Sequence, residues 1–185
     1  KKDKNELDFI KLNKKKKEIK IIINKINEYL CVHLENQISA GADVVQIFDS
    51  WAGLLPDDNL RDFCFIPNKE IVEFCKKKKI PVICFPKGIK KKYLEFAKIV
   101  NPDCLSLDYE INPNWARTNL NNYCLQGGLD PKILFEKEDV IFRAVDKYLN
   151  AFKGHPYIFN LGHGLLPETN PEVLQKLIDR VNNFK

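Results

Sequence analysis

The sequence predicts an α/β protein with parallel strands, and three observations support this fold class. Five short apolar runs are spaced along the chain, at residues 44–48, 81–85, 104–107, 123–125 and 157–161. These runs are rich in Val, Ile, Phe and Cys and mostly lack apolar/polar alternation, which is typical of strands that are buried on both faces of a parallel sheet. Stretches with helical periodicity separate them, which is the third observation.

The helical stretches follow in chain order. Residues 16–40 place apolar side chains at steps of three and four, and Gly41 is a plausible stop signal. The same pattern predicts helices at residues 69–78, 91–100, 138–152 and 171–184, and a shorter helix between the third and fourth runs. Asn170 and Pro171 fit the cap and first turn of the last helix. Helices and strands therefore alternate, which favours right-handed βαβ connections.

Two architectures fit this alternation, an open doubly wound sheet and a (β/α)8 TIM barrel. No Gly-x-Gly-x-x-Gly or Walker-type loop follows the first strand, which lowers the weight of a nucleotide-binding open sheet. A complete barrel usually takes about 250 residues. We therefore expect residues 1–185 to be the C-terminal portion of a single TIM-barrel domain, a long helix and five or so βα units, with the N-terminal units absent. The sequence contains no methionine and has Lys1 as its first residue, which fits that expectation.

Composition argues against several classes of protein. The net charge of +5 comes from 26 lysines against 4 arginines, and we expect the lysine runs on solvated faces rather than in a nucleic-acid or substrate site. No run approaches the roughly 18 apolar residues of a membrane span, and no signal-like segment follows the first lysines. The expected location is the cytoplasm, with an organelle left open. The six cysteines lack Cys-x-x-Cys spacing, so we expect buried thiols and no metal.

In a barrel the active site lies at the C-terminal ends of the strands, so the residues after each apolar run are the candidates. They are Asp49–Trp51, Lys87–Gly88, Asp108–Glu110, Gln126–Gly128 and Asn160–Gly164. His163 is the sharpest candidate because glycine on both sides lets the backbone turn tightly or approach a ligand closely. For any single residue of the set, the alternative is that strand ends are polar simply because the backbone emerges into water there.

Five ordered motifs resemble the uroporphyrinogen decarboxylase family. They are VVQIFDSWAGLL at 44–55, FPKG at 85–88, LSLDY at 105–109, LQGGLDP at 125–131 and FNLGHGLLPE at 159–168. The resemblance runs from about residue 41 to 181. The departures are Tyr109 where many members have Trp, Gly128 where Asn is usual, and Pro86 where Ala or Gly is usual.

This resemblance implies a TIM-barrel carboxy-lyase, usually a homodimer, that acts without metal or organic cofactor. Such enzymes remove CO2 from the four acetate side chains of uroporphyrinogen, giving coproporphyrinogen for heme biosynthesis. The family's acid Arg and pyrrole-binding Asp are expected upstream, so no catalytic residue is expected in this segment. By motif matching, Ser50 and His163 stand at two substrate-binding positions. The implied partner is a tetrapyrrole, with no nucleic acid and no membrane.

Two alternatives remain open. A methylcobalamin-dependent methyltransferase of the same superfamily shares this fold but holds zinc through a His-x-Cys element and a distant Cys, and this sequence has no His-x-Cys. The second alternative, from a different class, is an inactive fragment or interaction module.

Overall fold

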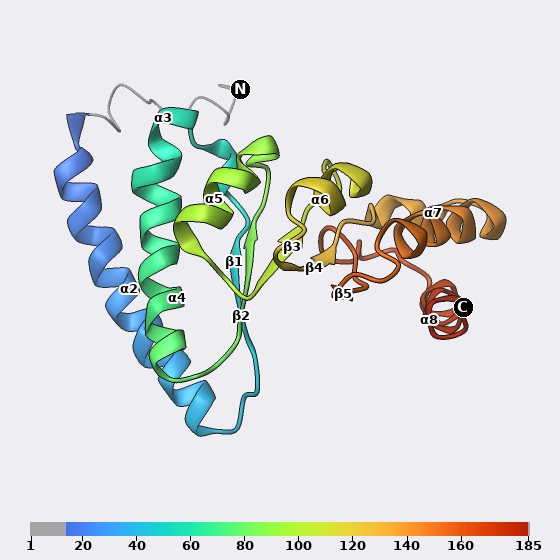
Figure 1. The fold of residues 1–185 in the computed structure, drawn as a ribbon, viewed down its shortest axis with the longest axis horizontal. Coiled ribbons are helices and arrows are strands. Elements are labelled where there is room, and N and C mark those ends of the chain that lie inside the picture. The colour runs from blue at the N-terminus through green and yellow to red at the C-terminus, as the bar shows by residue number, and fades with distance from the viewer. Residues whose placement is uncertain (1–13, 185) are drawn as a thin grey trace. The chain divides into compact units, whose positions relative to one another are not determined.

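The computed structural model describes residues 14–184 and divides into two compact units. The first unit ends at Asp103 and the second begins at Cys104; each is traced in Figure 1. The first lysines of the chain, after which the sequence shows no signal-like segment, lie outside the described residues.

The first unit is built on a pair of parallel strands covered by helices. Strand β1 (Val45–Asp49) pairs with β2 (Val82–Pro86) over their whole length. Helices α2 (Lys16–Ser39) and α4 (Ile66–Lys77) run side by side in Figure 1, and α4 also contacts α5 (Tyr93–Val100). Every residue of β2 is buried, as expected for a strand covered on both faces.

An irregular helical segment precedes α4. Helix α3 (Asp57–Leu60) passes directly into a π-helical turn, η2 (Arg61–Phe65), in which the Ile66 N–H donates to the Arg61 carbonyl. Pro67 explains the irregularity, because it has no N–H to donate to the carbonyl four residues earlier. The sequence predicted only residues 69–78 as helix here, so the first turn of α4 and all of α3 and η2 were missed.

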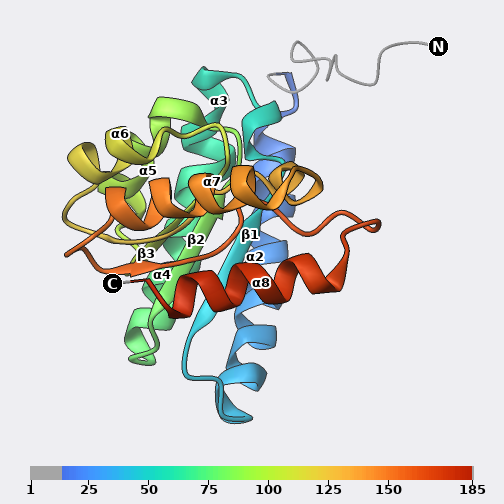
Figure 2. The same cartoon turned by 90° about the vertical axis from the view of Figure 1, so that its right-hand side faces the viewer.

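The second unit contains three parallel strands. β3 (Cys104–Leu107) pairs with β4 (Cys124–Gly127), which in turn pairs with the short β5 (Tyr157–Ile158). The helices are α6 (Pro113–Asn119), α7 (Glu138–Ala151) and α8 (Pro171–Asn182). Figure 2 shows α7 and α8 side by side, where the Arg180 guanidinium binds both carboxylate oxygens of Asp146.

Short 3-10 turns complete the two units: η1 (Ala52–Leu54) and η3 (Lys90–Lys92) in the first, and η4 (Pro131–Phe135) in the second. The predicted α/β class with parallel strands is confirmed. The fifth strand is shorter than the predicted 157–161, because the side chain of Asn160 takes up the Leu161 N–H at 2.8 Å. Beyond β5, Leu161 forms only an isolated bridge with Leu129.

The cysteines are free thiols and most are buried. Cys84 and Cys104 are buried as predicted, whereas Cys124 is only half-buried. Burial raises the pKa of Cys75 to about 11, with smaller contributions from Cys31 and Asp103, so this thiol stays protonated at neutral pH. Across residues 14–184, no helix is long and apolar enough to cross a bilayer.

Candidate functional site

Ser50 directly follows β1, at the C-terminal end of that strand, and is half-buried. The end of β1 is held by Asn68 of α4, whose side-chain amide donates to the Asp49 carboxylate at 3.1 Å and to the Cys64 carbonyl at 2.9 Å. Asn68 is only 5% exposed, and a buried amide must find such partners. The link therefore fixes the backbone from which Ser50 projects.

The loops after β1 and β2 touch through their backbones. The Gly53 N–H donates to the Lys87 carbonyl at 2.8 Å, and a Cβ on Gly53 would lie 2.6 Å from the backbone of Gly88. No side chain fits in that space. Because parallel strands end at the same edge of a sheet, this contact joins the two predicted strand-end motifs of the first unit.

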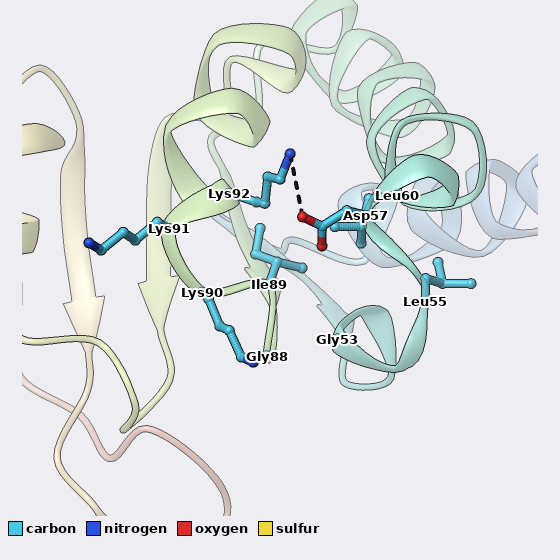
Figure 3. Close-up of a pocket in the computed structure, with 9 residues that line it drawn as sticks. All are labelled: Gly53, Leu55, Asp57, Leu60, Gly88, Ile89, Lys90, Lys91 and Lys92. Atoms are coloured by element: carbon cyan, nitrogen blue, oxygen red, sulfur yellow. Dashed lines mark ion pairs between the residues drawn. The ribbon is translucent and has the colours of Figure 1, made fainter. Parts of the chain in front are cut away.

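A cavity of about 480 Å³ lies between these two loops (Figure 3). Its apolar lining comes from Leu55, Leu60 and Ile89, and its polar lining from Asp57 and the lysines of η3. Figure 3 shows the Lys92 ammonium directed at the Asp57 carboxylate, with 3.7 Å between the charged atoms. The sequence predicted that the lysine runs lie on solvated faces. For the run Lys90–Lys92, that prediction missed the cavity that these residues line.

His163 lies in the second unit, on an exposed bend just after the Leu161 bridge. The bend is anchored by Gly162, whose N–H donates to the Leu129 carbonyl at 2.7 Å. A Cβ on Gly162 would lie 2.5 Å from the Tyr109 nitrogen, whereas one on Gly164 would meet nothing within 4 Å. Of the two flanking glycines, only Gly162 is required by a close backbone approach.

Asp108 is the most deeply buried carboxylate among the predicted strand-end residues, at 1% exposure. Its Oδ1 accepts from the Glu110 N–H at 2.9 Å. The neighbouring strand supplies Gln126, whose side chain donates to the Ser106 hydroxyl at 3.2 Å. These contacts hold the ends of β3 and β4 in place, so the local structure already gives both side chains a positioning role.

Two tyrosines hold the Gly127–Gly128 turn. The Tyr157 hydroxyl donates to the Gly127 carbonyl at 2.9 Å and the Tyr148 hydroxyl to the Gly128 carbonyl at 2.5 Å. Burial, then the nearby carboxylates of Asp130 and Asp108, raises the pKa of Tyr148 to about 12. Tyr148 is therefore a structural donor at neutral pH.

The structure gathers the candidates in two groups. Asp49, Ser50, Lys87 and Gly88 share the first unit, and Asp108, Gln126 and His163 share the second. Sequence reasoning missed the role of Asn68. The one signal that could have indicated it is the single amide side chain, next to Pro67, on a helix face that is otherwise apolar. Within residues 14–184, no three His, Cys, Asp or Glu side chains gather as metal ligands would.

Comparison with known proteins connects this arrangement to one family. The family model described as uroporphyrinogen decarboxylase (URO-D) matches residues 6–184. A protein named uroporphyrinogen decarboxylase from Orientia tsutsugamushi (strain Ikeda) is 40% identical over 178 residues, covering 95% of this chain and 52% of that protein. One of the same name from Cereibacter sphaeroides (strain ATCC 17025 / ATH 2.4.3) is 37% identical over 164 residues, covering 86% and 48%.

Among solved structures, a methyltransferase from Methanosarcina mazei superimposes with a TM-score of 0.73 at 20% identity, covering 85% of this chain and 47% of that chain. At that identity the likeness shows the fold alone, and together with the family match it confirms the expected partial TIM barrel. The chain spans about half the length of the curated relatives it matches. With its five ordered motifs at strand ends and a family match over nearly all its residues, the chain belongs to the uroporphyrinogen decarboxylase family.

Proposed function

We propose that this chain is the substrate-binding C-terminal portion of a uroporphyrinogen decarboxylase, with residues 1–185 forming part of one barrel domain. The observation that carries the proposal is the location of the family motifs. The DSW, PKG, LDY and QGG segments each span the C-terminal end of a parallel strand, and LGHG begins at the Leu161 bridge. Barrel enzymes carry their active sites at these strand ends.

The proposed reaction needs an acid and an anion. Protonation of a pyrrole ring carbon gives a cation, and the C–C bonding electrons of the acetate arm flow into that cation as CO2 leaves. The exocyclic carbon is then protonated to give a methyl group, and the ring carbon loses the proton it first gained, which restores the aromatic pyrrole. The pyrrole thus acts as its own electron sink, which is why we propose chemistry without metal or organic cofactor. The acid Arg and the Asp that holds the pyrrole N–H groups would come from the length of the relatives that this chain does not match.

In this scheme Ser50 and His163 bind carboxylate arms of the substrate. A serine hydroxyl can donate a hydrogen bond to a carboxylate, and an imidazole can donate one and, when protonated, partly neutralise the charge. The Asn68 link behind Ser50 and the Gly162 contact beside His163 support this role, because a binding group is most effective when its backbone is held in place.

The test is Ser50→Ala and His163→Ala, made at the matching positions of the Orientia tsutsugamushi relative. We expect a higher KM for uroporphyrinogen with a smaller loss in kcat, because these groups contact side arms rather than the reacting carbon. Lys77→Gln, at the end of α4 that precedes β2, is the control. Unchanged kcat and KM in both variants would remove Ser50 and His163 from the site.

The methyltransferase alternative shares the fold of the Methanosarcina mazei structure, and that likeness supports the fold alone. Zinc analysis of the same purified relative separates the two, since one tightly bound zinc per chain would favour the alternative. A homodimer and a place in heme biosynthesis follow from the proposal, and sedimentation of the intact enzyme tests the first.

A further inference from the structure

The cavity between η1 and η3 has two kinds of wall. Leu60 and Ile89 are almost wholly buried and form part of an apolar lining with Leu55. The lysines of η3 lie along another side. An apolar surface beside several cations fits an anion that also carries a hydrophobic body, and a volume of about 480 Å³ is within the range of small-molecule sites.

The charge at this cavity is only partly compensated. Lys92 pairs with Asp57 at 3.7 Å and with Glu95 at 3.4 Å. Within residues 14–184, neither Lys90 nor Lys91 makes an ion pair or a hydrogen bond through its side chain. In Figure 3 the Lys90 side chain extends toward Gly88, while Lys91 extends away from Asp57. Three lysines against the two carboxylates of Asp57 and Glu95 leave one excess positive charge at the cavity.

Specific backbone contacts fix the shape of the cavity. The Gly53–Lys87 hydrogen bond and the Gly53–Gly88 backbone contact hold its two loops together. Lys90 has a φ of 52°, in the left-handed region. Among residues 14–184, the other non-glycine residues with positive φ are Lys79 and Asn101, which follow the ends of α4 and α5, where a left-handed residue is common. Lys90 instead begins η3, where no helix end accounts for its conformation.

We propose that this cavity binds part of an amphipathic polycarboxylate, with the Lys90–Lys92 ammonium groups contacting its carboxylates and the leucines and Ile89 its apolar body. Resting on the proposed function, that ligand is the tetrapyrrole octacarboxylate, and the cavity holds a peripheral part of it. Gly53 is three residues beyond Ser50 in the chain, so the cavity extends the edge of the first unit that carries the proposed Ser50 contact. The η3 lysines are thereby assigned to substrate affinity.

The experiment titrates the 185-residue chain with uroporphyrin, the stable oxidised octacarboxylate, and follows porphyrin fluorescence and the amide NMR signals of Gly53, Gly88 and η3. We expect shifts in those amides, and a Kd about tenfold weaker in Lys90→Gln/Lys91→Gln (about 1.4 kcal/mol), because two charge contacts are lost. Added salt should weaken binding for the same reason. The matched control is Lys77→Gln/Lys98→Gln, which removes the same charge from helices α4 and α5 outside the cavity lining.

Equal affinity in the two double variants, or amide shifts confined to residues outside the cavity, would overturn the proposal. Inorganic phosphate and benzene-1,3,5-tricarboxylate serve as comparison probes. Phosphate that shifts the same amides at equal concentration would overturn it in favour of a general anion site. If the tricarboxylate shifts these amides and uroporphyrin does not, the tetrapyrrole assignment fails. Because binding is measured without turnover, loss of the cavity site leaves the KM test of Ser50 and His163 unaffected.

Discussion

The two glycines that flank His163 have different tasks, although the sequence treats them alike. We expect Gly162→Ala to lower the free energy of unfolding by about 1–3 kcal/mol, because the added Cβ would lie 2.5 Å from the Tyr109 nitrogen and backbone must move. Gly164→Ala is the matched control and should change it by under about 0.5 kcal/mol, since its Cβ would meet nothing within 4 Å. Urea unfolding measures both, and equal losses would contradict the assignment.

Gly128 shows why one departure from the family pattern is tolerated here. Its φ is +105°, and a Cβ would lie 2.8 Å from the Tyr148 ring, so the ring occupies the space that the usual Asn side chain would need. We expect Gly128→Asn to destabilise the chain by more than about 1 kcal/mol, from backbone strain and crowding together. The Gly128→Asn/Tyr148→Phe pair keeps the crowding and loses the hydroxyl, so thermal unfolding of that double variant should show no rescue. Rescue would show that the hydroxyl, not the ring, is the obstacle.

At the scale of one element, the junction of η2 and α4 determines how β1 ends. Asn68→Ala should cost about 1–3 kcal/mol, because the Asp49 carboxylate and the Cys64 carbonyl lose their donor inside the protein. It should also shift the Ser50 amide signal in NMR spectra. Asn119→Ala removes a similar amide-to-carbonyl bond, to Trp115, on an exposed helix and is the control. A Ser50 signal that does not move in Asn68→Ala would separate this junction from the site.

The segment leading into β5 should respond to pH through His155. Burial, then the nearby Arg117 charge, lowers the pKa of this imidazole, against the Tyr123 carbonyl that accepts from its ring N–H. The unfolded chain therefore binds the proton more readily, and stability should fall as pH drops below about 6.5, the ordinary histidine value. His155→Gln keeps a donor but does not titrate, so the stability gap between wild type and variant should change between pH 7 and 5. A constant gap would contradict the prediction.

Most elements could be predicted from the sequence because their patterns are local. The long helix was predicted as residues 16–40 and is observed as Lys16–Ser39; its apolar spacing and Gly41 suffice for that. The η2 turn and the truncation of β5 were missed because they depend on single interactions, the absent N–H of Pro67 and the Asn160 side chain.

The candidate site divides in the same way. Ser50 and His163 were found through motifs that follow strands, and strand ends can be predicted from apolar runs. Asn68 and the η3 cavity were not found, because each depends on which parts of a unit meet in space. The sequence does not distinguish a buried asparagine from a solvated one. Only the contacts of Asn68 with the Asp49 carboxylate and the Cys64 carbonyl show that it is buried and bonded.

At the scale of the whole molecule, the chain covers 52% of its Orientia tsutsugamushi relative. We expect these 185 residues alone to release no CO2 from uroporphyrinogen, because the proposed acid and anion are not among the matched motifs. Joining the chain to the part of that relative it does not match should restore turnover, measured as coproporphyrinogen formed. The relative itself is the positive control, and turnover by the chain alone would contradict the expectation.

The backbone contact between Gly53 and Gly88 has a consequence for how this protein can be altered. Since the loops after β1 and β2 meet without side chains between them, their lengths are coupled. A substitution in either loop leaves these lengths unchanged, whereas an insertion in one loop would require a compensating change in the other. Variation within the family should therefore appear here as substitutions, and insertions should collect in segments that touch no second loop.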